Sequence, residues 1–321
     1  MPAACRAEIE RDARSPGPHR TANLILVAVD GVRWQDVFGD AAELPNLRRL
    51  MARGVAIGAP DHGSPMFASG PEFISLPGYQ ELLGGRPTEC TSNHCRAIDH
   101  PTLLDDAADF EPAAISSWER IERATAVDNS RIVLSAGRHH GETRDRLRVD
   151  DCASALLDEA ARAPARPGRV DYRADRYTSL LALEYVVKRR PRALFIGLGD
   201  TDEYGHAHDR AAYLRALSEV DGFIGALFTA LDSLGDYGAE TTVMITTDHG
   251  WSDDLDDHGG FAPESGRVFL LAAGGSIPAR GLVDARTRHH LADVAPTARA
   301  LLQLPPDRDP RAGRPIAELL Q

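Results

Sequence analysis

Long apolar runs and lysine are the two features that this sequence most clearly lacks. No stretch of 18 or more apolar residues is present, so we expect no segment that spans a membrane. Lys188 is the only lysine among 321 residues, and arginine supplies the other basic side chains. The formal net charge is −12. Nucleic-acid polymers and anionic membrane surfaces are therefore poor candidate partners for this chain.

Cysteine is also scarce, with four residues at positions 5, 90, 95 and 152. They lack the paired spacing of a cysteine-based zinc site. Cys90 and Cys95 are close enough in sequence for a local disulfide, and two reduced thiols are the equal alternative. The cysteines thus leave the redox state of this segment open.

The first residues of the chain contain no apolar segment of the kind found in secretory signals. We expect residues 1–22 to form a flexible leader before the first strand. The sequence as printed predicts a cytoplasmic protein. A periplasmic or secreted location is the alternative if the N-terminus is truncated.

Strand and helix patterns alternate along most of the chain. Strands are predicted at 23–29, 112–117, 131–136, 193–198, 242–247 and 267–273. Helices are predicted at 44–54, 77–85, 101–110, 152–163, 177–189, 209–234 and 288–304, the last with a kink at Pro296. This alternation predicts an α/β fold with a mostly parallel central sheet and helices on both faces. We expect one domain over residues 23–321, in which about 86–170 forms in part a small cap.

Polar residues follow three of the short apolar runs directly. Asp30 follows the run 24–29, Asp202 and His206 follow 193–198, and Asp248 and His249 follow 243–246. Ligands of open α/β sheets bind outside the carboxyl ends of the strands, so these side chains are expected at one edge. Carboxylates and imidazoles together suit zinc or manganese. The sequence thus predicts a metal centre at this edge.

Each of these signals has an ordinary structural alternative. A single aspartate after a strand, such as Asp30, is often a turn former. The spacing of Asp202 and His206 is a weak signal alone, and Asp248 with His249 also suits a polar turn. His258, in the Asp- and Gly-rich segment "DDLDDHGG", is either a ligand or an exposed loop histidine. The convergence of all of them on one edge favours the metal centre.

Ser75 lies at the start of a predicted helix, two residues before Pro77. The structural alternative is a helix N-cap. The functional interpretation is a nucleophile, because a cation beside a serine makes its hydroxyl proton easier to lose. The free N–H groups of a helix start would also hold an anionic substrate.

Seven motifs in a fixed order connect these residues to a known family. They are "VAVDG", "PNLRRLMARGV", "SLPGYQELLGGR", "GDTDEYGHAHD", "TTDHGW", "DHGG" and "DVAPTARALL". Together they resemble the alkaline phosphatase superfamily from about residue 23 to 304. The closest resemblance is to compact nucleotide pyrophosphatase/phosphodiesterase-like and related phosphatase domains.

The resemblance implies two metal ions and their ligands. One metal would be held by Asp30, Asp248 and His249, with Ser75 bridging or adjacent. The other would be held by Asp202, His206 and His258. Asn93 matches in position an asparagine that contacts a phosphate oxygen in the phosphodiesterase-like relatives. Arg86 and Arg96 are the arginines nearest to Ser75 in sequence, and Arg96 is the expected second phosphate-binding residue.

Two departures from the family narrow the expected chemistry. Ser75 stands where phosphodiesterase-like relatives usually carry threonine, whereas phosphatase and mutase relatives carry serine. Tyr79 occupies the position at which the sulfatase signature needs arginine, which argues against a sulfatase.

The sequence therefore predicts a metal-dependent hydrolase of phosphate esters that acts on a small phosphorylated substrate through a phosphoserine at Ser75. The expected cofactors are two divalent ions, zinc or else manganese. The alternatives on the same site are a phosphodiesterase or nucleotide pyrophosphatase, a phosphonate hydrolase and a phosphomutase. A non-catalytic metal-binding domain is a further alternative.

Overall fold

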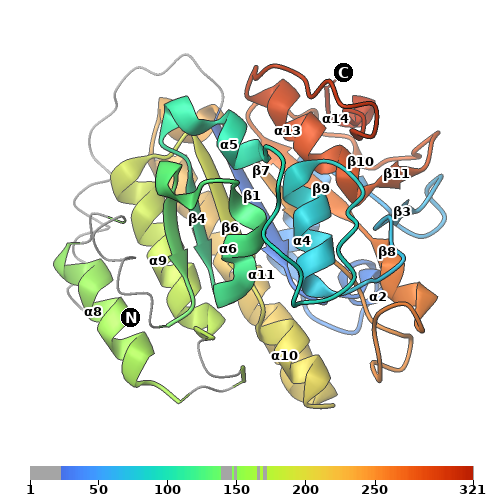
Figure 1. Cartoon of the computed structure of the whole chain (residues 1–321), viewed down its shortest axis with the longest axis horizontal. Coiled ribbons are helices and arrows are strands. Elements are labelled where there is room, and N and C mark those ends of the chain that lie inside the picture. The colour runs from blue at the N-terminus through green and yellow to red at the C-terminus, as the bar shows by residue number, and fades with distance from the viewer. Residues whose placement is uncertain (1–22, 139–146, 148–149, 165–166, 169–171, 321) are drawn as a thin grey trace.

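A computed structural model describes residues 23–138, 147, 150–164, 167–168 and 172–320. The expected leader, 1–22, lies outside the described residues. Figure 1 shows a central sheet with helices on both of its faces, as the sequence predicted. None of the described helices is long and apolar enough to cross a membrane.

The main sheet has eight strands in the order β10-β2-β9-β7-β1-β6-β4-β5. Its parallel part runs from β7 to β5, and β9 pairs antiparallel with both β7 and β2. The strands are β1 (Asn23–Val29), β2 (Val55–Ile57), β4 (Ala113–Ser116), β5 (Val133–Ala136), β6 (Ala193–Leu198), β7 (Thr241–Thr246), β9 (Leu270–Gly274) and β10 (Gly281–Leu282). The predicted α/β class with a mostly parallel sheet is confirmed.

Side chains of the central strand β1 alternate between two apolar cores. Ile25, Val27 and Val29 pack on one face of the sheet, and Leu24 and Leu26 pack on the other. This strand is buried on both sides, as expected for a parallel sheet between two helical layers. The first core includes α3 (Pro45–Arg53), α8 (Asp151–Arg162), α9 (Asp175–Arg189) and α11 (Arg210–Ser233). The second includes α4 (Ser75–Gly84), α5 (Leu103–Asp106), α6 (Glu122–Thr125), α13 (Val294–Leu301) and α14 (Ala317–Leu320).

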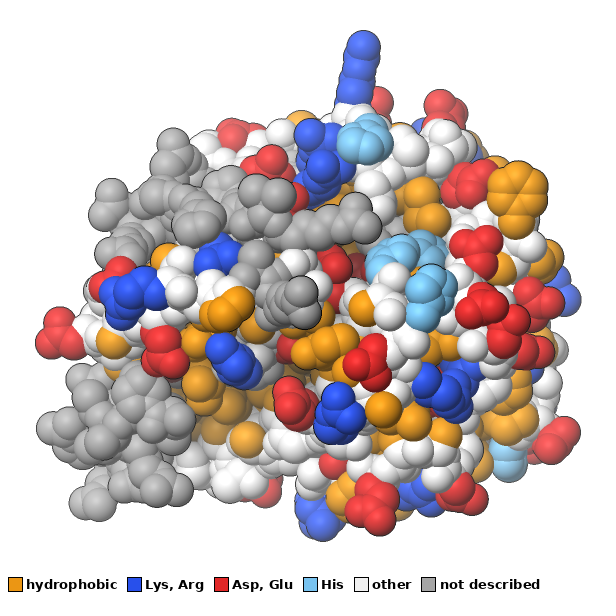
Figure 2. Space-filling model, turned by 90° about the horizontal axis from the view of Figure 1, so that it is seen from below, with side chains coloured by type: hydrophobic (Ala, Val, Ile, Leu, Met, Phe, Trp, Pro, Cys, Tyr) orange, Lys and Arg blue, Asp and Glu red, His pale blue; other side chains and the backbone are white. Residues whose placement is uncertain are grey.

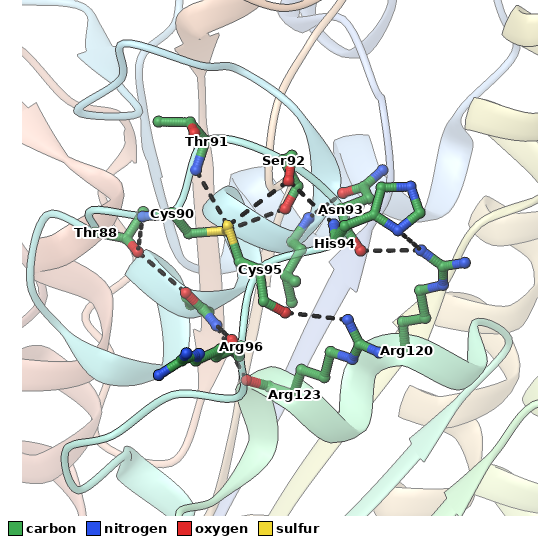
Figure 3. The surroundings of a disulfide bond; sticks show 12 residues. Thr88, Cys90, Thr91, Ser92, Asn93, His94, Cys95, Arg96, Arg120 and Arg123 are labelled. Atoms are coloured by element: carbon green, nitrogen blue, oxygen red, sulfur yellow. Dashed lines mark hydrogen bonds between the residues drawn. A yellow bond between two sulfur atoms is a disulfide. The ribbon is translucent and has the colours of Figure 1, made fainter.

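Shorter elements connect these layers. They are α2 (Trp34–Phe38), α10 (Asp200–His206), α12 (Asp236–Ala239) and five 3-10 turns, namely η1 (Ala108–Phe110), η2 (Glu119–Ile121), η3 (Asn129–Arg131), η4 (Pro263–Gly266) and η5 (Leu291–Asp293). The segment 86–170, which we expected to form in part a cap, contributes β4 and β5 to one edge of the main sheet. A disulfide joins Cys90 and Cys95 in the same segment (Figure 3).

Two sequence predictions near the C-terminus need correction. The strand predicted at 267–273 divides at Phe269 into β8 (Arg267–Val268) and β9, and β8 joins a second sheet of order β11-β3-β8 with β3 (Met66–Phe67) and β11 (His289–His290). The predicted helix 288–304 begins later, because its first residues form β11 and η5. Pro296 lies in the first turn of α13, where a missing N–H breaks no helical hydrogen bond, so no kink is needed.

Candidate active site

Three neighbouring strands deliver the candidate ligands to one edge of the sheet. β1 pairs in parallel with β6 on one side and with β7 on the other. Asp30 directly follows β1, α10 with Asp202 and His206 begins just beyond β6, and Asp248 lies two residues beyond β7. Figure 2 shows histidine side chains gathered on the face seen from below, the side on which α10 lies in Figure 1.

Asp30, Asp248 and His249 form one compact group. Their candidate ligand atoms all lie within 4.8 Å of one another, and all three side chains are buried. His249 Nε2 is 3.2 Å from Asp30 Oδ1 and 3.7 Å from Asp248 Oδ2. Ser75 Oγ donates to Asp30 Oδ1 at 3.4 Å. These four are the residues that the sequence analysis assigned to one metal.

A second group adjoins the first. Asp202, His249 and His258 also bring their ligand atoms within 4.8 Å of one another. His206 lies at the rim of this group, with Nε2 3.2 Å from Asp202 Oδ2 and 3.3 Å from His258 Nε2. The structure therefore brings together Asp202, His206 and His258, as predicted, and places His249 between the two groups. The sequence did not indicate this central position.

The tautomers of two histidines are set by backbone carbonyl groups. His249 Nδ1 lies 2.8 Å from the carbonyl oxygen of Gly250, and His258 Nδ1 lies 3.0 Å from that of Phe73. Each Nδ1–H donates to its carbonyl, so the neutral ring carries its lone pair on Nε2. Both Nε2 atoms face the carboxylate cluster, which is the arrangement of metal-binding histidines.

Several buried polar atoms of the cluster lack hydrogen-bond partners among the described residues. They are Asp202 Oδ1, Asp248 Oδ2 and His249 Nε2. Unsatisfied buried polar atoms are rare in folded proteins and cost stability. His249 Nε2 lies between the other two, 4.0 Å from Asp202 Oδ1 and 3.7 Å from Asp248 Oδ2. Divalent cations among these atoms would satisfy all three, so the residues fit a metal centre.

The electrostatics of the cluster support the same conclusion. Burial and the Asp202 carboxylate raise the pKa of Asp30, and burial and Asp30 raise the pKa of Asp248 well above its ordinary value. Burial lowers the pKa of His249, but the surrounding carboxylates outweigh it and bring that pKa to about 10. Burial and the charge of His249 lower the pKa of His258 to about 4. Crowded carboxylates of this kind are relieved by bound cations.

Glycines bring the backbone close to the ligands. Gly31 has a φ of +62°, and a Cβ there would lie 2.4 Å from Asp202 Oδ1. A Cβ on Gly78 of α4 would lie 2.5 Å from the carbonyl oxygen of Asp248. The nucleophile helix can therefore pack directly on the segment after β7. Alanine at Gly31 would be strained by its φ as well as by the missing space.

Two supporting residues were missed in the sequence analysis. Trp251 packs against the rings of His206 and His258, at centroid distances of 5.0 and 4.5 Å. The aromatic residue directly after "TTDHG" was the available signal. Asp175 fixes the start of α10, because its carboxylate accepts hydrogen bonds from the backbone N–H groups of Gly199 and Asp200 at 2.8 and 2.9 Å. No sequence motif indicated Asp175.

Part of the chain matches a family model, and its fold matches those of solved structures. Residues 182–306 match the model of the Metalloenzyme superfamily. The fold is similar to an alkaline phosphatase, PafA (TM-score 0.61, 11% identity, 95% of this chain and 100% of that chain), and to a phosphonate monoester hydrolase of Agrobacterium radiobacter (TM-score 0.62, 18% identity, 93% and 77%). Residues 182–306 thus match a metalloenzyme family, and the fold of the chain is alkaline-phosphatase-like.

Sequence similarity extends to a curated mutase. A 2,3-bisphosphoglycerate-independent phosphoglycerate mutase of Rippkaea orientalis is 33% identical over 130 residues. This match covers 38% of the present chain and 23% of the mutase. The chain thus spans about a quarter of the length of that relative.

Ser75 is the first residue of α4. The N–H of the next residue, Leu76, donates to Asn93 Oδ1 at 2.8 Å. Asn93 lies within the loop closed by the disulfide, and Arg120 Nη1 donates to its carbonyl oxygen at 3.0 Å (Figure 3). The structure therefore places Asn93 beside the candidate nucleophile. It also places Arg120 next to Asn93, which the sequence analysis missed because Arg120 lies 45 positions after Ser75.

The two arginines singled out from the sequence lie elsewhere. Arg86 is held by Asp307 and Asp309 at 2.7 and 2.8 Å, in the C-terminal segment. Arg96 is exposed, and Figure 3 shows its side chain pointing away from Asn93, on the other side of the disulfide. The structure thus does not bring either guanidinium group to Ser75.

Proposed function

We propose that this chain is a metal-dependent phosphoric ester hydrolase that works through a phosphoserine intermediate on Ser75. The observation that carries the proposal is the position of the Ser75 hydroxyl. It is buried at the first turn of α4, and its Oγ lies 3.4 Å from Asp30 Oδ1 at the border of the carboxylate–histidine cluster. A serine at a helix start beside such a cluster is placed as a nucleophile for an anionic substrate.

We propose two divalent cations as cofactors, zinc or else manganese. Asp30, Asp248 and His249 would hold one of them next to Ser75. Asp202, His206 and His258 would hold the other. When bound, the cations supply positive charge that stabilises phosphoryl oxygens and the ionised serine.

The proposed reaction consists of two successive displacements at phosphorus. Ser75 Oγ attacks phosphorus, the bond from phosphorus to the alcohol oxygen breaks, and the alcohol leaves with a proton. Water then attacks phosphorus, the Oγ–phosphorus bond breaks, and phosphate and the free serine are restored. Asn93 Oδ1 is occupied by the N–H of Leu76, so its amide nitrogen is the atom available to donate to a phosphoryl oxygen.

A substrate panel tests this function directly. The purified chain should hydrolyse a phosphate monoester, a phosphate diester or a phosphonate monoester carrying a p-nitrophenyl group when zinc or manganese is present. A chelator should abolish the activity, and the added metal should restore it. Turnover that is insensitive to thorough metal removal would contradict the proposal, as would the absence of turnover on every substrate with every metal.

Arg120 and Arg96 form a matched pair of variants for substrate selectivity. We expect Arg120→Ala to lower kcat/KM for the monoester about ten- to a hundredfold. The guanidinium group beside Asn93 would no longer donate a charged hydrogen bond, of about 1.5–3 kcal/mol, to the phosphoryl group. The loss for the diester should be smaller, since a diester carries less negative charge. Arg96→Ala should change both values less than about twofold, as exposed surface substitutions usually do. A larger effect of Arg96→Ala than of Arg120→Ala would restore the sequence-based prediction for Arg96.

A phosphomutase is the second candidate function, favoured by the similarity to phosphoglycerate mutase. In that case the phosphoryl group on Ser75 would pass to an alcohol in place of water. Addition of an acceptor alcohol such as glycerol separates the two functions. With the phosphate monoester as substrate, a hydrolase should release phosphate and p-nitrophenol in equal amounts, whereas a mutase-like transferase should release less phosphate as the acceptor concentration rises.

A further inference from the structure

A second, basic site lies away from the carboxylate–histidine cluster. A cavity of about 1190 Å³ is bordered by β11, the segment before it and the C-terminal segment 311–318. Five arginines contribute to its wall, and we call it the arginine pocket: Arg280, Arg286, Arg288, Arg311 and Arg314. None of the candidate metal ligands lines it. Five guanidinium groups around one cavity stand out in a chain with a net charge of −12.

The acidic side chains of the pocket are already engaged with other groups. Asp293 accepts hydrogen bonds from the backbone N–H groups of His290 and Arg314 at 2.8 and 2.7 Å. Glu318 Oε2 lies 3.2 Å from His289 Nε2. Asp284, the third carboxylate, is 3.2 Å from His62 Nδ1. These contacts direct the carboxylate oxygens to histidines and backbone groups, and the five guanidinium groups outnumber the three carboxylates that line the pocket.

The arginine side chains differ in their partners. Arg311 pairs with Asp309 at 3.1 Å, and Arg288 lies over the ring of Phe67 at 5.1 Å. Within the described part of the chain, the side chains of Arg286 and Arg314 contact no carboxylate. Both are exposed to solvent in the pocket. They are therefore available to an anionic ligand.

We propose that the arginine pocket binds a small ligand with two or more phosphate groups. Guanidinium groups match phosphate oxygens in bidentate geometry and keep their charge at all physiological pH values. A single phosphate has fewer oxygens than five bidentate guanidinium groups would fill. The cavity volume of about 1190 Å³ is large enough for a ligand the size of a nucleotide. A compact oligophosphate therefore fits both the charge and the size.

The floor of the pocket is attached to the nucleophile helix. Ser69 and Ala292 both line the cavity, and both donate to Glu81 on α4, Ser69 Oγ at 2.7 Å and the N–H of Ala292 at 2.9 Å. The arginine pocket and the candidate active site thus adjoin one helix from different sides. The proposed ligand site is nevertheless separate from Ser75 and does not depend on its chemistry.

Binding of inorganic triphosphate to the metal-loaded Ser75→Ala chain tests the proposal. The Ser75 substitution prevents turnover, and excess magnesium in the buffer keeps all of the triphosphate in its magnesium complex. We expect saturable binding by calorimetry that Arg286→Glu and Arg314→Glu each weaken at least about tenfold, which corresponds to about 1.4 kcal/mol. Arg131→Glu is the matched control, because Arg131 is also exposed but lies outside the pocket, and it should shift binding less than about twofold.

Two further measurements keep the test decisive. Circular dichroism should show unchanged folding of each variant, and Arg286→Gln and Arg314→Gln should give intermediate losses because they remove charge without reversing it. Orthophosphate at concentrations that occupy the active site should not displace the probe. The proposal is overturned by absent binding, by equal binding to the pocket variants and the control, or by full competition with orthophosphate.

Discussion

Replacement of Ser75 by alanine is expected to lower kcat/KM for the best ester substrate by roughly 10³-fold or more, as the loss of a nucleophile usually does. The substitution removes the attacking oxygen but none of the carboxylate and imidazole groups of the cluster. Among the described residues, the Ser75 hydroxyl makes one hydrogen bond, a long one to Asp30, so the fold should also persist. Steady-state kinetics, metal analysis and a thermal melt on the same preparation measure the three effects separately.

The covalent intermediate provides a second test of Ser75. Acid quenching of the parent enzyme during turnover should leave a phosphoryl group on the peptide that contains Ser75, and the alanine variant should carry none. Ser218→Ala is a suitable control, because Ser218 is exposed on α11 and its hydroxyl bonds only to the carbonyl oxygen of Leu214 among the described residues. Near-parental activity of Ser75→Ala would mean that water attacks the substrate directly.

Replacement of His258 by alanine is expected to lower the metal content from about two equivalents to about one, because protein sites of this kind need at least three ligands per ion. The change removes Nε2 from the group with Asp202 and His249, and it leaves Asp30 and Asp248 in place. Activity should fall by roughly 10²-fold or more, since half of the charge that stabilises the phosphoryl group is lost. Metal analysis after extensive dialysis gives the stoichiometry.

His208→Ala is the matched control for His258. His208 is exposed, and its ring lies 3.7 Å from the exposed carboxylate of Asp256. The His208→Ala variant should retain the metal content and the activity of the parent chain. If His258→Ala kept two equivalents of metal, the third ligand would have to lie elsewhere. His289 and His290 both line the arginine pocket, so a ligand role for either of them would require a different site geometry.

The parallel core and the ligands at its edge were predictable because they depend on local patterns. Each of β1, β6 and β7 contains a short apolar run, and an aspartate of the cluster follows each strand within four residues. Parallel strands align their carboxyl ends, so the sequence pattern alone was sufficient to predict that Asp30, Asp202 and Asp248 lie together. The roles of these residues stay predictions until metal content and activity are measured.

The features that escaped sequence analysis depend on contacts between distant segments. β11 forms because His289 and His290 pair with Met66 and Phe67, more than 200 positions earlier, and helix propensity cannot reveal such a pairing. Arg120 reaches Asn93 only through the path of the disulfide loop. The central position of His249 likewise depends on how the segments after β6 and β7 approach each other.

The spread of the cluster along the chain has a consequence for how the protein folds and is stabilised. Its residues extend from Asp30 to His258, and β1 joins them only after pairing with strands that follow it by more than 150 positions. No early, local folding unit can contain the complete set of ligands. Cations should therefore bind the native state and hardly at all the unfolded chain, so each tenfold rise in free cation above Kd adds about 1.4 kcal/mol to the free energy of unfolding for each site. The availability of metal would thus set how long the folded protein survives, as well as whether it turns over substrate.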